Sequence, residues 1–368
     1  VPAAASPGRR HLRASEAPSD APEPHSVART CLPVASDQWA AQAYDSGDLG
    51  MVRGMRSSSL PASPATSARW IAPVLIPVVV ALVAGGTLAP KPDGTPFTAV
   101  VGAILAWALL LVLITWAVGL LPLLVRRAPT AGSTRPAQQP ASSAASWHRV
   151  RTALMVVSVF ILLTALAGRT PRLAFFTQFE NNWQGKLVDL LWVSILFAML
   201  WRWARDEARL TWRIRPGSGH WALIVIGAVF GVFVGLTLVA VATDPGIHET
   251  VDADQLLYNT TIPNLTEELI WRAAMLAVLD RAYGTPWRLA GAPVGWGLVV
   301  TSVIFGVVHL ILLSPSGEFS LNIGGGIFAA VMGVAMAWIW AYTRSVWPAF
   351  LLHCAPEVAV DVGMMIAA

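Results

Sequence analysis

Carboxylate and imidazole side chains interrupt three otherwise apolar stretches near the carboxyl end of the chain. Glu267 and Glu268 stand at the start of one stretch, His309 lies inside the second, and His353 with Glu357 lies inside the third. A carboxylate and an imidazole can together polarise a water molecule for attack on an amide, while a second imidazole donates to the developing oxyanion. The residue types therefore predict hydrolytic chemistry, provided that the fold brings the three stretches together.

Helical spacing gives several of these residues local partners. Glu268 and Arg272 are four residues apart, so they share a helix face and can neutralise each other. Glu267 is rotated from them by about 100° and has no partner at that spacing. Phe305 precedes His309 by one turn and is expected to pack beside its imidazole. An interfacial helix start and a hydrogen-bonded core histidine would explain each stretch alone, but together the stretches favour a site.

The third stretch carries a proline among its polar residues. His353 and Glu357 are four residues apart, and Pro356 between them is expected to kink the helix because proline lacks a backbone donor. The simpler interpretation is a His353–Glu357 pair that stabilises this kink. Cys354 is badly placed for activation by His353, since neighbouring helical residues point about 100° apart.

The composition sets the surroundings in which such a site must form. Hydrophobic residues make up 55% of the 368 residues and charged residues only 12%, too few to cover a soluble globule. Apolar runs recur, and the 17 Trp are of the kind that gathers at bilayer interfaces. We therefore expect an all-α polytopic integral membrane protein with about eight or nine transmembrane helices and its catalytic core in the last four. The expected spans are 70–88, 97–125, 152–168, 187–203, 221–242, 262–283, 293–313, 322–342 and 347–367.

Charge and cysteine usage exclude some partners and some chemistry. The net charge of +4 comes almost entirely from Arg between the apolar runs, so it indicates membrane orientation and not binding to nucleic acid. Two cysteines cannot form a disulfide framework. Two glycine-rich segments are expected to allow close helix packing or a bend: Gly227-x3-Gly231-x3-Gly235 and Gly324–Gly326.

The chain divides into three segments by composition. Residues 1–69 are rich in Ala, Pro and Ser and are expected to be a disordered tail, part of it an upstream start-site artefact. Residues 70–220 hold the amino-terminal transmembrane helices and Arg-rich cytoplasmic loops, and residues 221–368 hold the catalytic transmembrane core. The positive-inside rule puts the N-terminus inside and the acidic connection 244–254 outside. In this topology, straight helices would leave His353 roughly 10 Å or more from the depth of Glu267. Kinks, shorter helices or a different number of spans would close that gap.

The polar motifs resemble those of a known family. Three of them occur in the order found in CPBP intramembrane glutamic proteases, which include CAAX prenyl endopeptidases and bacteriocin-processing or bacteriocin-immunity proteins. A segment at 182–187 also resembles one seen upstream in bacterial members. The three motifs are Glu267-Glu268-x3-Arg272, Phe305-x3-His309 and His353-x3.

The resemblance implies a role for each matching residue. Glu267 would be the general base, His309 would help to position and activate the water, and His353 would contribute to the oxyanion site. Glu268 and Arg272 would hold the first helix. The resemblance also implies a metal-free site without a cofactor, and an integral protein of a bacterial cytoplasmic membrane acting on a membrane-associated protein or peptide.

One position departs from the family pattern. Glu357 stands where the family usually has Asn, and an ionised carboxylate beside a developing oxyanion would oppose catalysis. Zinc bound by Glu267, His309, His353 and Glu357 is the second choice for the site. A non-catalytic membrane scaffold or immunity protein is the alternative function, and a proton-relaying transporter is third. The sequence specifies neither a prenyl group on the substrate nor an oligomeric state.

Overall fold

The computed structural model describes residues 62–89, 97–125, 143–314 and 318–368. The expected tail lies outside these ranges apart from residues 62–69, which form a turn ahead of the first described helix. The Trp70 indole donates to the carbonyl oxygen of Pro64 (3.2 Å) and ties this turn to that helix.

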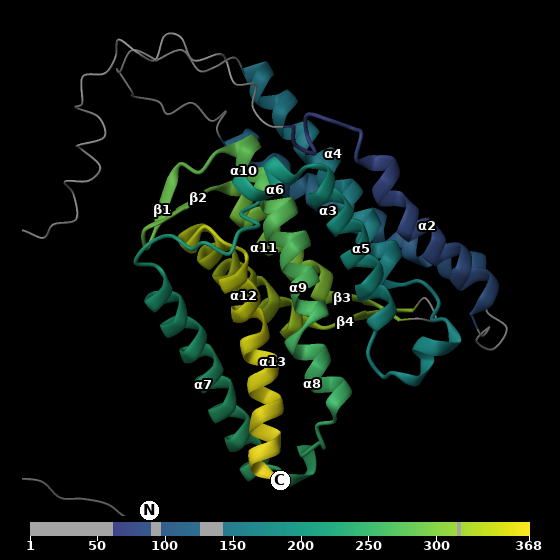
Figure 1. Ribbon diagram of the computed structural model, residues 1–368, viewed down its shortest axis with the longest axis vertical. Coiled ribbons are helices and arrows are strands. Elements are labelled where there is room, and N and C mark those ends of the chain that lie inside the picture. The colour runs from purple at the N-terminus through teal and green to yellow at the C-terminus, as the bar shows by residue number, and fades with distance from the viewer. Residues whose placement is uncertain (1–61, 90–96, 126–142, 315–317) are drawn as a thin grey trace, which may run out of the picture. The chain divides into compact units, whose positions relative to one another are not determined.

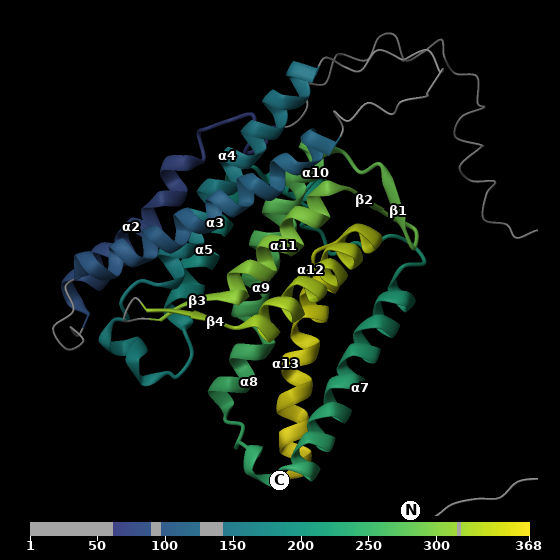
Figure 2. The same cartoon turned by 180° about the vertical axis from the view of Figure 1, so that it is seen from behind.

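Helices build most of the described chain (Figures 1 and 2). The amino-terminal elements are α2 (Ile71–Leu88), α3 (Phe97–Val125), α4 (Ser143–Gly168), the short η2 (Ala174–Gln178), α5 (Trp183–Met199) and α6 (Trp201–Asp206). The carboxyl-terminal elements are α7 (Gly219–Thr243), η3 (Pro245–Ile247), α8 (Ala253–Thr260), α9 (Ile262–Glu268), η4 (Leu269–Leu276), α10 (Ala277–Tyr283), α11 (Trp296–Leu310), α12 (Ile323–Thr343) and α13 (Trp347–Ala367).

Two small antiparallel hairpins accompany the helices. One pairs β1 (Trp287–Leu289) with β2 (Ala292–Val294) ahead of α11. The other pairs β3 (Ile311–Leu313) with β4 (Phe319–Leu321) between α11 and α12. The second hairpin ends α11 early, because residues 311–313 of the expected span leave the helix to form β3.

The all-α polytopic membrane class is confirmed. Within the described residues, six helices are long and apolar enough to cross a bilayer, namely α2, α3, α4, α7, α12 and α13. The expected spans at 187–203 and 293–313 correspond to α5 with 17 residues and α11 with 15, both shorter than the usual ~20. The expected span at 262–283 is the series α9, η4 and α10. The count of about eight or nine crossings stays a prediction.

A π-helical segment lies at the centre of the carboxyl-terminal half. Pro263 stands in the first turn of α9, where its missing N–H costs nothing. The helix then widens into η4, whose eight residues are all buried, and narrows again into α10. Wide turns of this kind often occur at functional sites, and this one begins directly after Glu268.

α8 extends this series into the region predicted as an acidic connection. Asp252 caps its start by accepting from the backbone N–H of Gln255 (2.8 Å). Buried Asp361 of α13 accepts from the side chains of Gln255 and Asn259, both at 2.8 Å. These bonds dock α8 against the far half of α13, beside which α7 also lies (Figure 1).

The glycine segments behave differently from one another. A Cβ on Gly306 of α11 would lie 2.7 Å from the Cβ of Ala330 and 2.8 Å from the carbonyl oxygen of Gly326. α11 and α12 therefore approach closely at Gly326, in agreement with the packing predicted for Gly324–Gly326. A Cβ added to Gly326 would likewise lie 2.6 Å from the Cβ of Leu310. Within the part of the chain that the structure describes, a Cβ at Gly227, Gly231 or Gly235 meets nothing within 4 Å, so the predicted close packing of the α7 stripe does not occur among these residues.

Candidate active site

A fully buried carboxylate joins three elements. Glu268 Oε1 pairs with Arg272 Nη1 of η4 at 2.9 Å and accepts from Nδ1 of His353 on α13, also at 2.9 Å. Both partners are buried as well. A carboxylate in an apolar interior is tolerated only when charges and hydrogen bonds compensate it, so Glu268 fixes the relative positions of α9, η4 and α13. The predicted Glu268–Arg272 ion pair is confirmed.

Phe305 of α11 packs between the charged and imidazole groups. The guanidinium carbon of Arg272 lies 4.4 Å from the ring centroid, a favourable cation–π contact. The ring also contacts the imidazoles of His309 (4.5 Å between centroids) and His353 (5.8 Å, nearly perpendicular). The predicted packing of Phe305 beside His309 is confirmed, and the same ring brings the second histidine alongside.

Glu267 points the other way and is partly exposed, with 20% of its side chain accessible. Its Oε1 accepts from Nζ of Lys186 on α5. Its Oε2 is buried, makes no hydrogen bond within the described residues, and lies 3.8 Å from Nε2 of His353. His309 is close enough to interact with Glu267 electrostatically. Glu267 therefore has one oxygen held by a cation and the other free beside imidazole.

The hydrogen bonds of the two histidines define which ring nitrogens remain available. Nδ1 of His309 lies 2.8 Å from the carbonyl oxygen of Phe305, an acceptor, so Nδ1 carries the proton and Nε2 is the basic nitrogen of the neutral ring. Nδ1 of His353 donates to Glu268 in the same manner, which leaves its Nε2 facing Glu267. Each ring is therefore held through Nδ1, by the Phe305 carbonyl oxygen for His309 and by Glu268 for His353. Nε2 is the nitrogen left for chemistry in both rings, and that of His353 faces Glu267.

Glu357 is held by a residue that the sequence reasoning missed. Its Oε2 accepts from Nδ2 of Asn264 at 2.6 Å. The predicted His353–Glu357 pair does not form, because Nδ1 of His353 bonds the more deeply buried carboxylate of Glu268 instead. Asn264 lies three residues before Glu267 on α9 and so shares a helix face with it. That spacing was the signal in the sequence that could have identified Asn264. α13 is a single helix through Pro356.

Lys186 also escaped the sequence reasoning, although the segment that contains it was singled out. Asn182 caps α5 by accepting from the N–H of Gly185 (3.2 Å), and the Trp183 indole donates to Asp254 of α8 (2.5 Å). Buried Gln184 donates to the carbonyl oxygen of Pro171 (3.0 Å). The segment therefore anchors α5 next to α8 and α9. A lysine at the start of an apolar run was the signal that could have identified it.

The predicted depth mismatch between His353 and Glu267 is wrong. The two side chains lie 3.8 Å apart. The prediction placed Glu267 near the start of its helical segment, whereas α8 precedes α9 and docks along α13. Glu267 consequently lies well inside the α8–α10 series, level with the second turn of α13.

The zinc alternative has no geometric support. Among the described residues, no group of three or more His, Cys, Asp or Glu side chains is arranged to hold a metal ion. The four residues of the second choice, Glu267, His309, His353 and Glu357, therefore do not form a ligand set.

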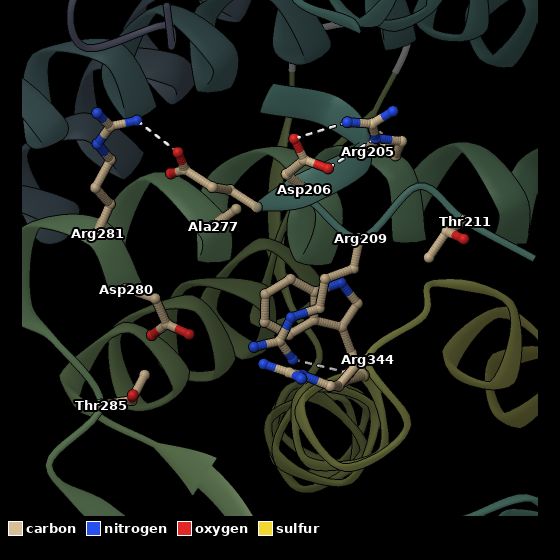
Figure 3. A pocket seen from close by; sticks show the side chains of 11 residues that line it. Arg205, Asp206, Arg209, Thr211, Ala277, Asp280, Arg281, Thr285 and Arg344 are labelled. Carbon is tan, nitrogen blue, oxygen red and sulfur yellow. Dashed lines mark hydrogen bonds and ion pairs between the residues drawn. The ribbon is translucent and has the colours of Figure 1, made fainter. Parts of the chain in front are cut away.

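A cavity of about 590 Å³ lies elsewhere, where α6, α10 and α12 meet (Figure 3). None of the predicted site residues lines it.

Comparison with known proteins identifies the segment that carries these contacts. Residues 252–358 match the family model described as Type II CAAX prenyl endopeptidase Rce1-like. The match contains every predicted site residue, and the resemblance to the CPBP family is confirmed over this segment. Lys186 lies outside it. No curated protein and no solved structure matches the chain significantly.

Proposed function

The chain carries an Rce1-like domain of the CPBP family, and from this premise we propose that it is an intramembrane endopeptidase. The family supports membrane protease activity in general. The more specific proposal is hydrolysis of a peptide bond in a membrane-associated protein or peptide by a water molecule that Glu267 and His309 activate. The observation that supports it best is the buried Oε2 of Glu267, which has no hydrogen-bond partner among the described residues and faces imidazole.

The proposed reaction assigns a role to each of three polar groups, Glu267, His309 and His353. Glu267 takes a proton from a water molecule oriented by Nε2 of His309, and the water oxygen attacks the scissile carbonyl carbon. His353 acts as an imidazolium whose Nδ1–H bonds Glu268 and whose Nε2–H donates to the developing oxyanion. Collapse of the tetrahedral intermediate breaks the C–N bond, and Glu267 returns its proton to the leaving nitrogen.

The remaining contacts keep these groups in position. Glu268 holds His353, and Arg272 neutralises Glu268 and packs on Phe305. Lys186 fixes Oε1 of Glu267 and so directs Oε2 toward His353. We propose Lys186 as a positioning residue of the site, so that the catalytic unit consists of residues 221–368 together with α5 from segment 70–220.

Asn264 donates to the carboxylate that departs from the family pattern. The family usually has Asn at the position of Glu357, and here the Nδ2 group of Asn264 lies 2.6 Å from the Glu357 carboxylate. Nδ2 of Asn264 also donates to the carbonyl oxygen of Asn259 (2.8 Å), so both of its N–H groups are used. We propose that Asn264 compensates the charge of Glu357.

The topology of the proposal follows from charge. We propose that the Arg-rich connections face the cytoplasm of a bacterial cell and that the N-terminus is inside. The substrate is defined here only by its association with the membrane.

The test compares new protein termini in cells that express the wild type, Glu267→Gln or Glu249→Gln at matched levels. Glu249 is an exposed glutamate between η3 and α8, so Glu249→Gln makes the same chemical change away from the site. Termini that appear with the wild type and with Glu249→Gln, but not with Glu267→Gln, support proteolysis through Glu267 and identify the substrate. Identical profiles in all three strains, together with a persisting cellular phenotype, refute it.

A non-catalytic binding protein is the second candidate, and one contact favours it. Oε1 of Glu267, the proposed base, is already paired with a lysine. A scaffold or immunity protein would keep its phenotype in a Glu267→Gln/His309→Ala double variant, whereas a protease would lose it.

A further inference from the structure

The cavity of about 590 Å³ lies at the ends of helices, next to the Arg-rich connection between α5 and α7 (residues 200–218). Its walls come from the end of α6 and the residues after it, from α10, and from the end of α12 (Figure 3). Trp201 and Trp212 of the same connection are 54% and 77% exposed, as expected for residues at a bilayer interface. The cavity therefore lies where apolar spans give way to the polar surface.

Four arginines and three acids line the cavity, and two of the arginines already have carboxylate partners. Arg205 binds Asp206 through Nε at 2.7 Å, and Arg281 binds Glu207 through Nη1 at 2.7 Å. These pairs leave Arg209 and Arg344 with the third acid, Asp280.

Arg209 and Arg344 face the cavity without an ion pair among the described residues. The guanidinium of Arg209 stacks on the Trp340 indole (3.7 Å to the centroid) and donates to the Trp340 carbonyl oxygen (3.0 Å). Arg344 follows α12 in the left-handed conformation (φ 61°) and is exposed. The two guanidinium groups lie side by side in Figure 3 and repel each other. Burial lowers the pKa of Arg209 to about 10, so it remains a cation at neutral pH.

Asp280 only partly balances these two charges. It attracts Arg209, but its Oδ1 is buried and makes no hydrogen bond within the described residues, and neither arginine forms an ion pair with it. Two adjacent cations with a single carboxylate leave room for one more anion, and paired guanidinium groups match the oxygens of phosphate.

We propose that this cavity binds a phosphate group through Arg209 and Arg344, and that the phosphate belongs to the headgroup of an anionic membrane phospholipid. The position at the ends of membrane spans favours a lipid, since basic pockets between helices on the positive side of membrane proteins bind such headgroups. Thr211 and Thr285 also line the cavity and add hydroxyl groups. The proposal is independent of the proteolytic function.

The test measures lipid binding to the purified full chain in a zwitterionic detergent by native mass spectrometry, with dioctanoyl phosphatidylglycerol as the probe. We expect one saturable site, and Arg344→Gln should raise its Kd by about 10-fold or more because it removes a charge-assisted contact. Arg213→Gln is the matched control, since Arg213 is an exposed arginine of the same connection that does not line the cavity. Its Kd should stay within about two-fold of wild type.

Asp280→Asn gives the proposal a variant with the opposite effect. Removing the competing carboxylate should tighten binding by about three-fold or more, a gain that misfolding cannot produce. Dioctanoyl phosphatidylcholine should bind much more weakly. Equal loss in Arg344→Gln and Arg213→Gln, or equal binding of both lipids, overturns the proposal. Binding of inorganic phosphate without preference for either lipid overturns the lipid as its source.

Discussion

Replacing Gly306 with alanine tests whether the close approach of α11 and α12 positions His309. The new Cβ would lie 2.7 Å from the Cβ of Ala330, where carbons normally rest about 3.5–4.0 Å apart. It would also lie 2.8 Å from the Gly326 carbonyl oxygen, a backbone atom that cannot rotate away. The two helices must therefore separate by about 1 Å, and His309, one turn further along α11, must move with its helix.

The expected effects concern both stability and rate. Overpacking of this kind lowers the free energy of unfolding by about 1–3 kcal/mol. A catalytic group misplaced by about 1 Å lowers kcat/KM by about 10- to 100-fold. The assay combines denaturant unfolding in micelles with cleavage of the substrate found by the terminus comparison, at a temperature where the variant is folded.

Gly231→Ala is the matched control for Gly306→Ala. It makes the same change in a membrane helix, but no described residue lies within 4 Å of the added Cβ. We expect unchanged activity and a stability equal to wild type or higher by up to ~1 kcal/mol, since alanine favours helix. Equal behaviour of the two variants would refute the reasoning from packing. A Gly306→Ala protein that is less stable but fully active would refute the link between this contact and His309.

Three further predictions concern the charged groups of the site. Lys186→Gln should lower kcat/KM about 10-fold because Glu267 loses the cation that holds it, and Lys186→Arg should retain part of the activity. Full activity in Lys186→Gln would show that Lys186 does not position Glu267. Arg272→Met should lower the free energy of unfolding by about 3–5 kcal/mol because Glu268 stays buried without its cation. Adding Glu268→Gln should recover part of that loss in a double-mutant cycle, and strict additivity would contradict the pairing. Glu357→Gln keeps an acceptor but removes a charge, so kcat/KM should rise a few-fold; a fall would show that the charge is needed.

Local spacing rules predicted the parts of the site that lie within one helix. The Glu268–Arg272 pair and the Phe305–His309 contact both follow from four-residue spacing, and both are present. The same rule failed for His353 and Glu357, because spacing permits a pair but burial selects among competing partners. Glu268 is fully buried and has the greater need of a donor, so His353 turns to it.

Contacts between helices could not be predicted from spacing. Lys186 and Glu267 are 81 residues apart, and only the docking of α5 beside α9 brings them together. The glycine patterns show the same limit. Gly306 and Gly326 meet across α11 and α12, whereas the stripe on α7 has the same capacity for close packing but no neighbour at that distance among the described helices. A small residue permits a close approach, and the rest of the fold decides whether another helix uses it.

The Lys186–Glu267 pair means that the segment matched by the family model and the set of residues that build the candidate site are not the same part of the chain. Residues 252–358 contain every residue of the three motifs. The lysine that pairs with Glu267 lies outside them, on α5, and is separated from them in sequence by α6 and α7. A chimera that exchanges only the family segment would therefore receive its lysine contact from the host protein. Two fragments divided within residues 207–218 could regain a complete site only by reassembling in the same bilayer.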